Sequence, residues 1–210
     1  DLAWLPDGTL VTGSGSKLMT WQSGAAAWAE TVDLGASGLR DITRLAVSPD
    51  GKWLAAIATA SEGPELWRVR LDGQELWRTA VTSGRASWPA WPSSTEIACV
   101  VSGADGGRIS IPCGGAPMAT TPALDIAGSI AFSPDGTAVY APASNDRGFV
   151  DLWRIDRQTG AATMVSNAAR DTYGPTVARD GTLVFKTQEY RTFLAEQVDG
   201  GVRPLTTFQA

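Results

Sequence analysis

One short pattern recurs along the chain and limits its possible folds more than any other feature of the sequence. It consists of a hydrophobic segment, a Pro-Asp-Gly turn and a second hydrophobic segment. The clearest copy covers residues 42–58, and further copies cover residues 1–11, 129–140 and 176–185, the last with Arg179 in place of the proline. Proline presets the φ of the first corner, aspartate bonds the backbone two residues on, and glycine takes a positive φ at little cost. Each copy therefore predicts two short strands joined by a tight turn.

The turn glycines recur at a regular interval, as expected for a repeat protein. The spacing is about 43 residues between Gly8 and Gly51 and between Gly136 and Gly181. The gap from Gly51 to Gly136 is about twice as long and contains a degenerate copy of the pattern at residues 87–98. A repeat of about 40–45 residues that holds four strands is typical of the blades of a β-propeller. We therefore expect an all-β fold, a β-propeller of four-stranded antiparallel blades. It would form a single domain with repeats at residues 1–41, 42–85, 86–127, 128–172 and 173–210.

The four predicted strands of each repeat are named A to D, from the innermost to the outermost. In the third repeat, strand C is expected at residues 108–113 and strand D at residues 118–121. In the fifth repeat, strands A to D are expected at residues 174–178, 182–187, 192–198 and 203–208. Five complete blades could close the ring edge to edge. The alternative is a six-bladed ring whose last blade lies outside this sequence.

Tryptophan occupies equivalent places in several predicted C strands, and the tripeptide Leu-Trp-Arg occurs three times, at residues 66–68, 76–78 and 152–154. A buried aromatic side chain removes about 150–250 Å² from water. We interpret Trp21, Trp67 and Trp153 as rings that fill the space between neighbouring blades. An aromatic platform for sugars or for a cationic ligand is the weaker alternative, because the rings do not gather in one set of loops.

These repeats resemble those of a known family. The Ser-Pro-Asp-Gly turn, the hydrophobic strand after it and the Leu-Trp-Arg segment look like the WD-like repeats of TolB-type β-propellers. Similar repeats occur in the propellers of prolyl-oligopeptidase-type and tricorn-type peptidases. The resemblance covers all 210 residues in five units. It implies the fold, whereas one such scaffold hosts many activities. TolB-like propellers usually have six blades, which is the reason for the six-bladed alternative.

The absence of histidine excludes more functions than any residue present supports. The chain has no His and only two Cys. By itself it therefore cannot build a Ser-His-Asp or Cys-His nucleophile, a His-based metal site or a four-thiolate site. Its net charge is −5 and its 17 Lys and Arg are scattered, which argues against binding nucleic acid. No apolar run is long enough to predict a membrane span. We expect no cofactor and no catalysis by this chain alone.

The candidate binding residues lie in two sets of segments that a propeller brings to one face. The B–C loops vary between repeats, and binding residues usually lie on variable loops held by a rigid scaffold. The segments that lead into the A strands reach the same face, near the expected mouth of the central channel. Charged side chains there could grip a protein or peptide ligand, or they could neutralise each other as a solvated rim. The predicted binding residues are Arg40, Asp41, Glu62, Arg85, Asn145, Asp146, Arg147, Asp171, Tyr173, Glu189, Tyr190 and Arg191.

Both cysteines belong to the third repeat, Cys99 in its predicted B strand and Cys113 at the end of its predicted C strand. A hairpin centred on Gly106 would set them directly opposite each other, within reach of a disulfide. The alternative is two buried thiols packed as small hydrophobic side chains. A bond would favour an oxidising compartment, which here means the periplasm or the extracellular space.

The function that these features favour is a TolB-like propeller acting as a non-catalytic protein- or peptide-binding scaffold. The alternative from another class is the propeller of a larger peptidase or hydrolase, which would admit substrates to a catalytic domain outside this sequence. A carbohydrate-active propeller is weaker, because sugar lyases built on propellers rely on metal-binding histidines, and this chain has none.

Overall fold

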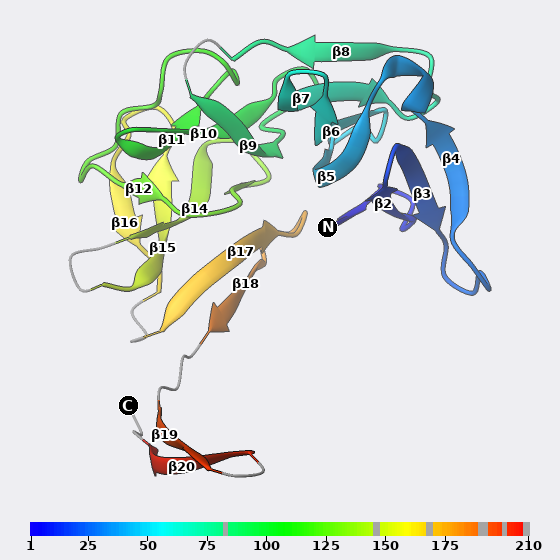
Figure 1. The fold of residues 1–210 in the computed structure, drawn as a ribbon. Coiled ribbons are helices and arrows are strands. Elements are labelled where there is room, and N and C mark those ends of the chain that lie inside the picture. Colours follow the sequence, from blue (N-terminus) through cyan, green and yellow to red (C-terminus); the bar gives the residue numbers. More distant parts are fainter. Residues whose placement is uncertain (82–83, 145–147, 167–169, 189–192, 199–200, 208–210) are drawn as a thin grey trace.

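The computed structural model of the chain describes residues 1–81, 84–144, 148–166, 170–188, 193–198 and 201–207. These residues form antiparallel sheets and one short 3-10 turn, η1 (Gly35–Ser37). Figure 1 shows the sheets formed by the described residues up to position 188 arranged in an arc about a common axis. The all-β propeller fold predicted from the repeats is confirmed.

The first two repeats are four-stranded sheets in which strands adjacent in sequence pair with each other. The first sheet contains β1 (Leu2–Trp4), β2 (Leu10–Ser14), β3 (Lys17–Trp21) and β4 (Ala29–Asp33), in that order. The second sheet contains β5 (Arg40–Val47), β6 (Trp53–Ala60), β7 (Gly63–Arg70) and β8 (Leu76–Thr79), again in that order.

The third and fourth repeats depart from this regular plan. The third sheet contains β9 (Arg85–Ala90), β10 (Ala98–Gly103) and β11 (Gly106–Ser110). No strand forms at residues 118–121, where its D strand was predicted. The preceding residue, Pro117, makes a single bridge with Ser110, and Thr121 bridges to Ala161 of the fourth repeat. The C strand of the third sheet ends at Ser110, before a proline that has no N–H to donate to the ladder. The fourth sheet contains β14 (Ala138–Ser144), β15 (Val150–Asp156) and β16 (Ala162–Met164), and its divided inner strand consists of β12 (Asp125–Ile126) and β13 (Ala131–Phe132).

The hydrophobic core lies between neighbouring sheets, and strand alternation decides which residue faces which neighbour. In β6, Leu54 and Ala56 pack against the first sheet, whereas Ala55 packs against the third. In β10, Cys99 packs towards the second sheet and Val100 towards the fourth. A strand that is buried on both faces needs apolar side chains along its whole length. This is why β6 reads as a continuous hydrophobic run.

The Pro-Asp-Gly turns form as predicted. Gly51 and Gly136 have φ values of 69° and 70°, a region that other residues adopt only with strain. In the turn of the fourth repeat, Asp135 Oδ1 accepts hydrogen bonds from the Ser133 hydroxyl at 2.6 Å and from the Thr137 N–H at 3.1 Å. These hydrogen bonds favour the ionised carboxylate and lower the pKa of Asp135 from 3.8 to about 2. The bond from Ser133 has the largest effect.

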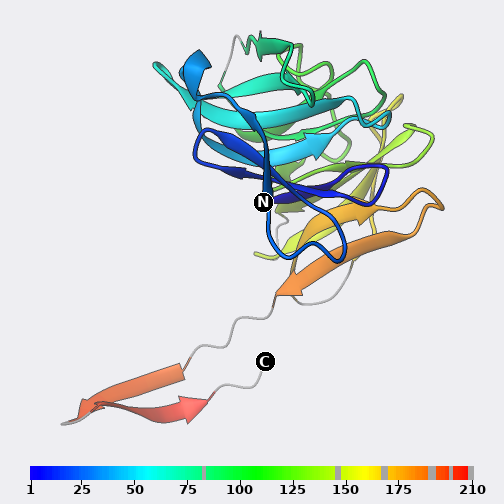
Figure 2. The ribbon, with the colours of Figure 1, turned by 90° about the vertical axis from the view of Figure 1, so that its right-hand side faces the viewer.

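The fifth repeat corrects the prediction of one four-stranded blade. Its strands form two separate two-stranded sheets, β17 (Asp171–Val177) with β18 (Leu183–Gln188), and β19 (Phe193–Val198) with β20 (Gly201–Thr207). Figures 1 and 2 show the β19–β20 hairpin apart from the other sheets. A hairpin pairs the inward backbone groups of both of its strands, so β19 and β20 can form their ladder without β18.

The two ends of the arc expose apolar side chains. Leu2 and Trp4 of β1 are 60% and 64% exposed, and Val184 and Phe185 of β18 are 61% and 38% exposed. Between these ends, each sheet packs against a neighbour on both faces. In the part of the chain that the structure describes, no strand of the first repeat pairs with a strand of the fifth.

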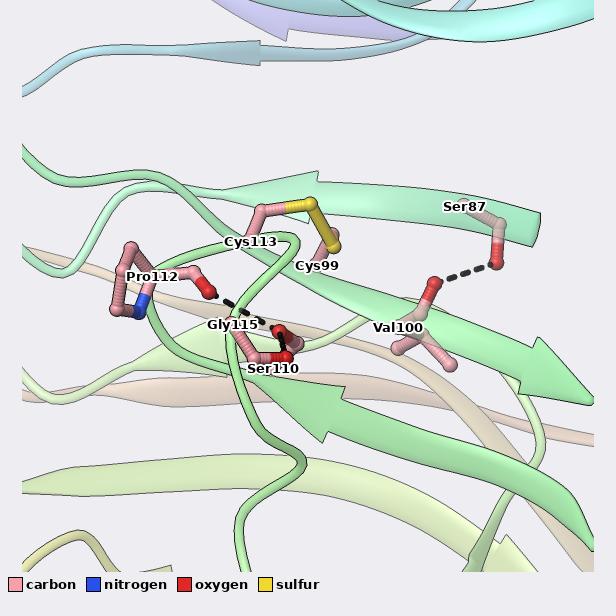
Figure 3. Close-up of a disulfide and its surroundings, with 7 residues drawn as sticks. All are labelled: Ser87, Cys99, Val100, Ser110, Pro112, Cys113 and Gly115. Carbon is pink, nitrogen blue, oxygen red and sulfur yellow. Dashed lines mark hydrogen bonds between the residues drawn. A yellow bond between two sulfur atoms is a disulfide. The ribbon is translucent and has the colours of Figure 1, made fainter. Parts of the chain in front are cut away.

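A disulfide joins Cys99 to Cys113 in the third repeat (Figure 3). The two residues are not directly opposite each other in the hairpin, because Cys99 pairs with Ser110 in the β10–β11 ladder. The chain turns after Ser110, whose hydroxyl lies 3.0 Å from the carbonyl oxygens of both Pro112 and Gly115. This turn brings Cys113 back to β10. The bond therefore ties the end of the sheet to its middle strand, in a repeat whose inner turn has lost both the aspartate and the glycine.

Candidate functional site

The innermost strands of three repeats carry the same irregularity. In β5, β9 and β17 the pairing register shifts so that two residues oppose one residue of the neighbouring strand, which is a β-bulge. In each of these bulges the first residue has a positive φ, namely Arg44 (52°), Trp88 (50°) and Gly174 (62°). A positive φ costs a residue other than glycine about 1–2 kcal/mol. Strained backbone of this kind gathers at binding sites, so the bulges point to the centre of the arc as the candidate site.

A cavity of about 1030 Å³ lies where the inner strands meet. Its wall is formed by the inner strands of all five repeats together with residues of the adjoining turns. Because proline has no N–H, a wall rich in proline offers few backbone donors and a mostly apolar surface. The aromatic rings and prolines that line the cavity are Trp4, Trp88, Trp91, Phe132, Pro6, Pro49, Pro89, Pro92, Pro134 and Pro175.

Three lining residues from successive repeats contact one another. The Oδ2 atom of Asp1 accepts a hydrogen bond from the backbone N–H of Arg44 at 2.7 Å. The guanidinium carbon of Arg44 lies 4.6 Å from the centre of the Trp88 ring. An indole ring attracts a cation to its face and so holds the guanidinium in place. Among the described residues Arg44 has no ion-pair partner, so its charge is available to a ligand.

Three of the predicted binding residues, Arg40, Asp41 and Arg85, lie at the other end of the inner strands. Arg40 pairs with Thr59, next to the turn between β6 and β7, and Arg85 pairs with Ser102, next to the turn between β10 and β11. Asp41, 3.8 Å from Arg40, begins a second bulge of β5 and has a φ of 53°. Their placement beside the B–C turns is the one expected, but none of these residues lines the cavity.

The other members of the predicted set are dispersed. Glu62 lies 3.8 Å from Arg78 in an exposed ion pair. Asp171 accepts the backbone N–H of Val150 at 2.9 Å and so ties the fifth repeat to the fourth. Tyr173 belongs to β17 but not to the cavity wall. The remaining six predictions fall outside the described residues and stay predictions: Asn145, Asp146, Arg147, Glu189, Tyr190 and Arg191.

The sequence reasoning missed Asp1, Arg44 and Trp88. The available signal was their position, since each lies a few residues before the turn of its repeat, in or beside the predicted inner strand. Inner strands surround the central channel of a propeller, so polar and aromatic residues there were candidates. What the sequence did not reveal is the bulge, because neither Arg44 nor Trp88 is a residue type that favours positive φ.

The described residues contain no group of three or more His, Cys, Asp or Glu side chains placed to hold a metal ion. Likewise, no helix within the described ranges combines the length and the apolar character needed to cross a membrane.

No protein-family model matches the sequence, and no curated protein matches it either. Solved structures do match. A protein of Agrobacterium tumefaciens assigned as TolB is 18% identical, with a TM-score of 0.75, over 98% of this chain and 79% of that chain. The chain folds as a TolB-like β-propeller. TolB of Acinetobacter baumannii is also 18% identical, with a TM-score of 0.68. The match covers 93% of this TolB-like chain and 50% of the Acinetobacter chain.

Propellers of other functions match less closely. A puromycin-hydrolyzing peptidase of Mycobacterium tuberculosis is 15% identical, with a TM-score of 0.56, over 89% of this chain and 34% of that chain. At such identities the likeness is one of fold, because the same scaffold carries unrelated activities. The function of this TolB-like propeller must therefore be argued from its own residues.

Proposed function

We propose that the chain is a non-catalytic scaffold that binds an extended segment of a partner protein in the central cavity. The observation that supports this most directly is Arg44, a cation stacked on Trp88 in the wall of the cavity and without an ion-pair partner among the described residues. The cavity, at about 1030 Å³, matches the upper end of the range of pockets that enclose ligands.

The composition of the wall favours a peptide segment with apolar side chains and one acidic group. Aromatic rings and prolines provide contact area for apolar side chains at little cost in conformational entropy. The Arg44 guanidinium can donate two parallel hydrogen bonds to a carboxylate, and such charge-assisted bonds are about twice as strong as neutral ones. Because the guanidinium of Arg44 is already stacked on the Trp88 ring, less side-chain entropy is lost when the ligand binds.

We propose an exported location for the chain, in the periplasm or outside the cell. The Cys99–Cys113 bond supports this location, because disulfides form and persist in oxidising compartments and are rare in the cytosol.

The alternative role, a propeller that admits substrates to a catalytic domain, has weaker support. It rests only on the similarity in fold to a peptidase, and no contact among the described residues supports it. In contrast, the strained bulges and the stacked arginine are features of this chain itself.

The proposal can be tested with peptides selected against the whole chain from a random library displayed on phage. Binding of the selected peptides is then measured by calorimetry for the wild type and for two matched variants. Arg44→Gly removes the cavity cation from a residue whose φ is 52°, and Asp41→Gly relieves the same backbone strain at 53° on the far end of the strand.

Arg44→Gly is expected to weaken peptide binding by about tenfold or more, because a charge-assisted hydrogen bond contributes about 1.5–3 kcal/mol. Its stability should stay close to that of the wild type, since relief of about 1–2 kcal/mol of strain offsets the lost contact with Trp88. Asp41→Gly should leave affinity unchanged. The opposite result, with Asp41→Gly impaired and Arg44→Gly intact, would move the site to the B–C face.

A further inference from the structure

A second concave site lies on the outer side of the arc, between the second and third sheets. It is a groove of about 370 Å³ whose walls come from β7 and β8 on one side and from the segments before β10 and after β11 on the other. Two of the three Leu-Trp-Arg tripeptides meet here. In the β7–β8 ladder, Arg68 pairs with Trp77 and Trp67 pairs with Arg78. The proposed binding in the central cavity uses none of these residues.

The guanidinium of Arg68 lies over two aromatic rings. Its central carbon lies 3.8 Å from the centre of the Trp53 ring and 5.5 Å from that of Trp91. The Trp91 ring is itself held by a hydrogen bond from Nε1 to the carbonyl of Ala46 at 2.9 Å. Stacked arginine is the usual way to fix a planar fork of donors for a carboxylate. The position of Arg68 is therefore set before any ligand arrives.

The outer nitrogens of Arg68 are open to the groove. Its Nε is buried without a hydrogen-bond partner, whereas Nη1 and Nη2 are not among the buried atoms that lack a partner. Among the described residues, Arg68 donates no hydrogen bond and joins no ion pair. The two Nη atoms must therefore be accessible to solvent on the side of the groove.

The charges of the groove leave one cation without a counterion. Arg78 is paired with Glu65 at 3.3 Å. Glu96 is paired with Arg157 of the fourth repeat. Arg68 is the third charged residue of the lining and has no ion-pair partner in the part of the chain that the structure describes. One positive charge in a partly enclosed groove suits one negative charge of a ligand, and a partly buried guanidinium can bind a carboxylate through two hydrogen bonds.

The groove also offers an apolar contact beside this cation. The Trp77 ring is 61% exposed and lies opposite Arg68 in the ladder. Ile97 and Pro112 line the other wall. An exposed indole next to apolar side chains can stack on a flat ring of the ligand. A compact anion such as phosphate would make no use of this apolar surface.

We propose that this groove binds a small monocarboxylate with an aromatic body, its carboxylate on the Arg68 fork and its ring on Trp77. The volume of the groove is at the lower end of the range for small-molecule pockets. The ligand is thus a metabolite-sized molecule rather than a protein segment, and the groove shares no lining residue with the central cavity.

Phenylacetate is a suitable probe, with phenylacetamide as its uncharged counterpart and sulfate as a compact anion. Binding is followed in the intact chain by the NMR signal of the Trp77 indole N–H, assigned with Trp77→Phe. Phenylacetate should shift this signal at millimolar concentration, while phenylacetamide and sulfate should not. No shift up to about 10 mM phenylacetate, which corresponds to less than about 3 kcal/mol of binding, would overturn the proposal. An equal response to sulfate would overturn the aromatic part of it.

Arg68→Gln should weaken phenylacetate binding by about tenfold or more. The matched control is Arg154→Gln, which changes the arginine of the third Leu-Trp-Arg tripeptide, exposed in the fourth sheet, and should leave the affinity unchanged. If Arg68→Gln fails to fold, Trp77→Ala serves instead, with binding followed by the backbone N–H signal of Ile97 in the same groove. The Trp77 side chain is mostly exposed, so its loss should weaken binding without unfolding the chain. Unchanged affinity in Trp77→Ala, or equal losses in Arg68→Gln and Arg154→Gln, would refute the site.

Discussion

Removal of the disulfide gives the most quantitative test of how the third repeat is held together. The bond joins residues 14 positions apart. In the chain-entropy model, closing a loop of this length removes enough freedom from the unfolded chain to stabilise the fold by about 3 kcal/mol. The double variant Cys99→Ala/Cys113→Ala should therefore have a free energy of unfolding lower by about 3 kcal/mol. For a chain of this size the melting temperature should fall by about 6–12 °C.

Urea denaturation, followed by tryptophan fluorescence and by circular dichroism, measures this difference. The wild type is compared with and without a phosphine reductant, and the double alanine variant serves as the control that the reductant cannot affect. Reduced wild type and double variant should unfold at the same urea concentration, below that of the oxidised protein. The slope of the transition should rise, because an unfolded chain without the cross-link exposes more surface.

Two results would refute this reasoning. If the oxidised wild type and the double variant unfold at the same midpoint, the turn that returns Cys113 to β10 is stable without the bond. If the variant loses much more than 3 kcal/mol, the sulfur atoms matter mainly as packing, since Cys99 is fully buried between two sheets.

Three further predictions concern turns and contacts between sheets, and urea denaturation tests each of them. Asp135→Asn should flatten the dependence of stability on pH: the wild-type carboxylate, with a pKa of about 2 against 3.8, stabilises above about pH 4, and this contribution is lost as the pH falls towards 2. Gly13→Ala should destabilise by about 1–3 kcal/mol, because the new Cβ would lie 2.1 Å from the carbonyl oxygen of Ile42 in the next sheet. Trp91→Phe should cost about 1–3 kcal/mol, because it leaves the carbonyl of Ala46 without its indole donor. A variant as stable as the wild type would contradict the corresponding contact.

The sequence predicted the parts of the fold that depend on local chemistry. The turns at Gly51 and Gly136 follow from residue types that have few other conformations, and the strands beside them follow from apolar runs. The alternation of Leu54, Ala55 and Ala56 between two neighbouring sheets also follows, once the repeat implies that each blade is covered on both faces.

The sequence could not predict features that depend on contacts between repeats. The bulges at Arg44 and Trp88 place unfavourable residue types at positive φ, so local preference argues against them and only tertiary packing can hold them. The groove beside Arg68 also escaped prediction, because its walls come from different repeats. The separate pairing of β19 with β20 was missed for a similar reason, since a repeat pattern gives strand order but not which ladder forms.

The uncovered ends of the arc affect the tendency of the protein to self-associate in solution. Leu2 and Trp4 on one side, and Val184 and Phe185 on the other, leave apolar surface exposed to solvent at both ends. Patches of this sort favour clumping, and sulfate or phosphate salts strengthen that tendency whereas cooling weakens it. Buffer choice and protein concentration will thus govern whether light scattering reports single particles or clusters.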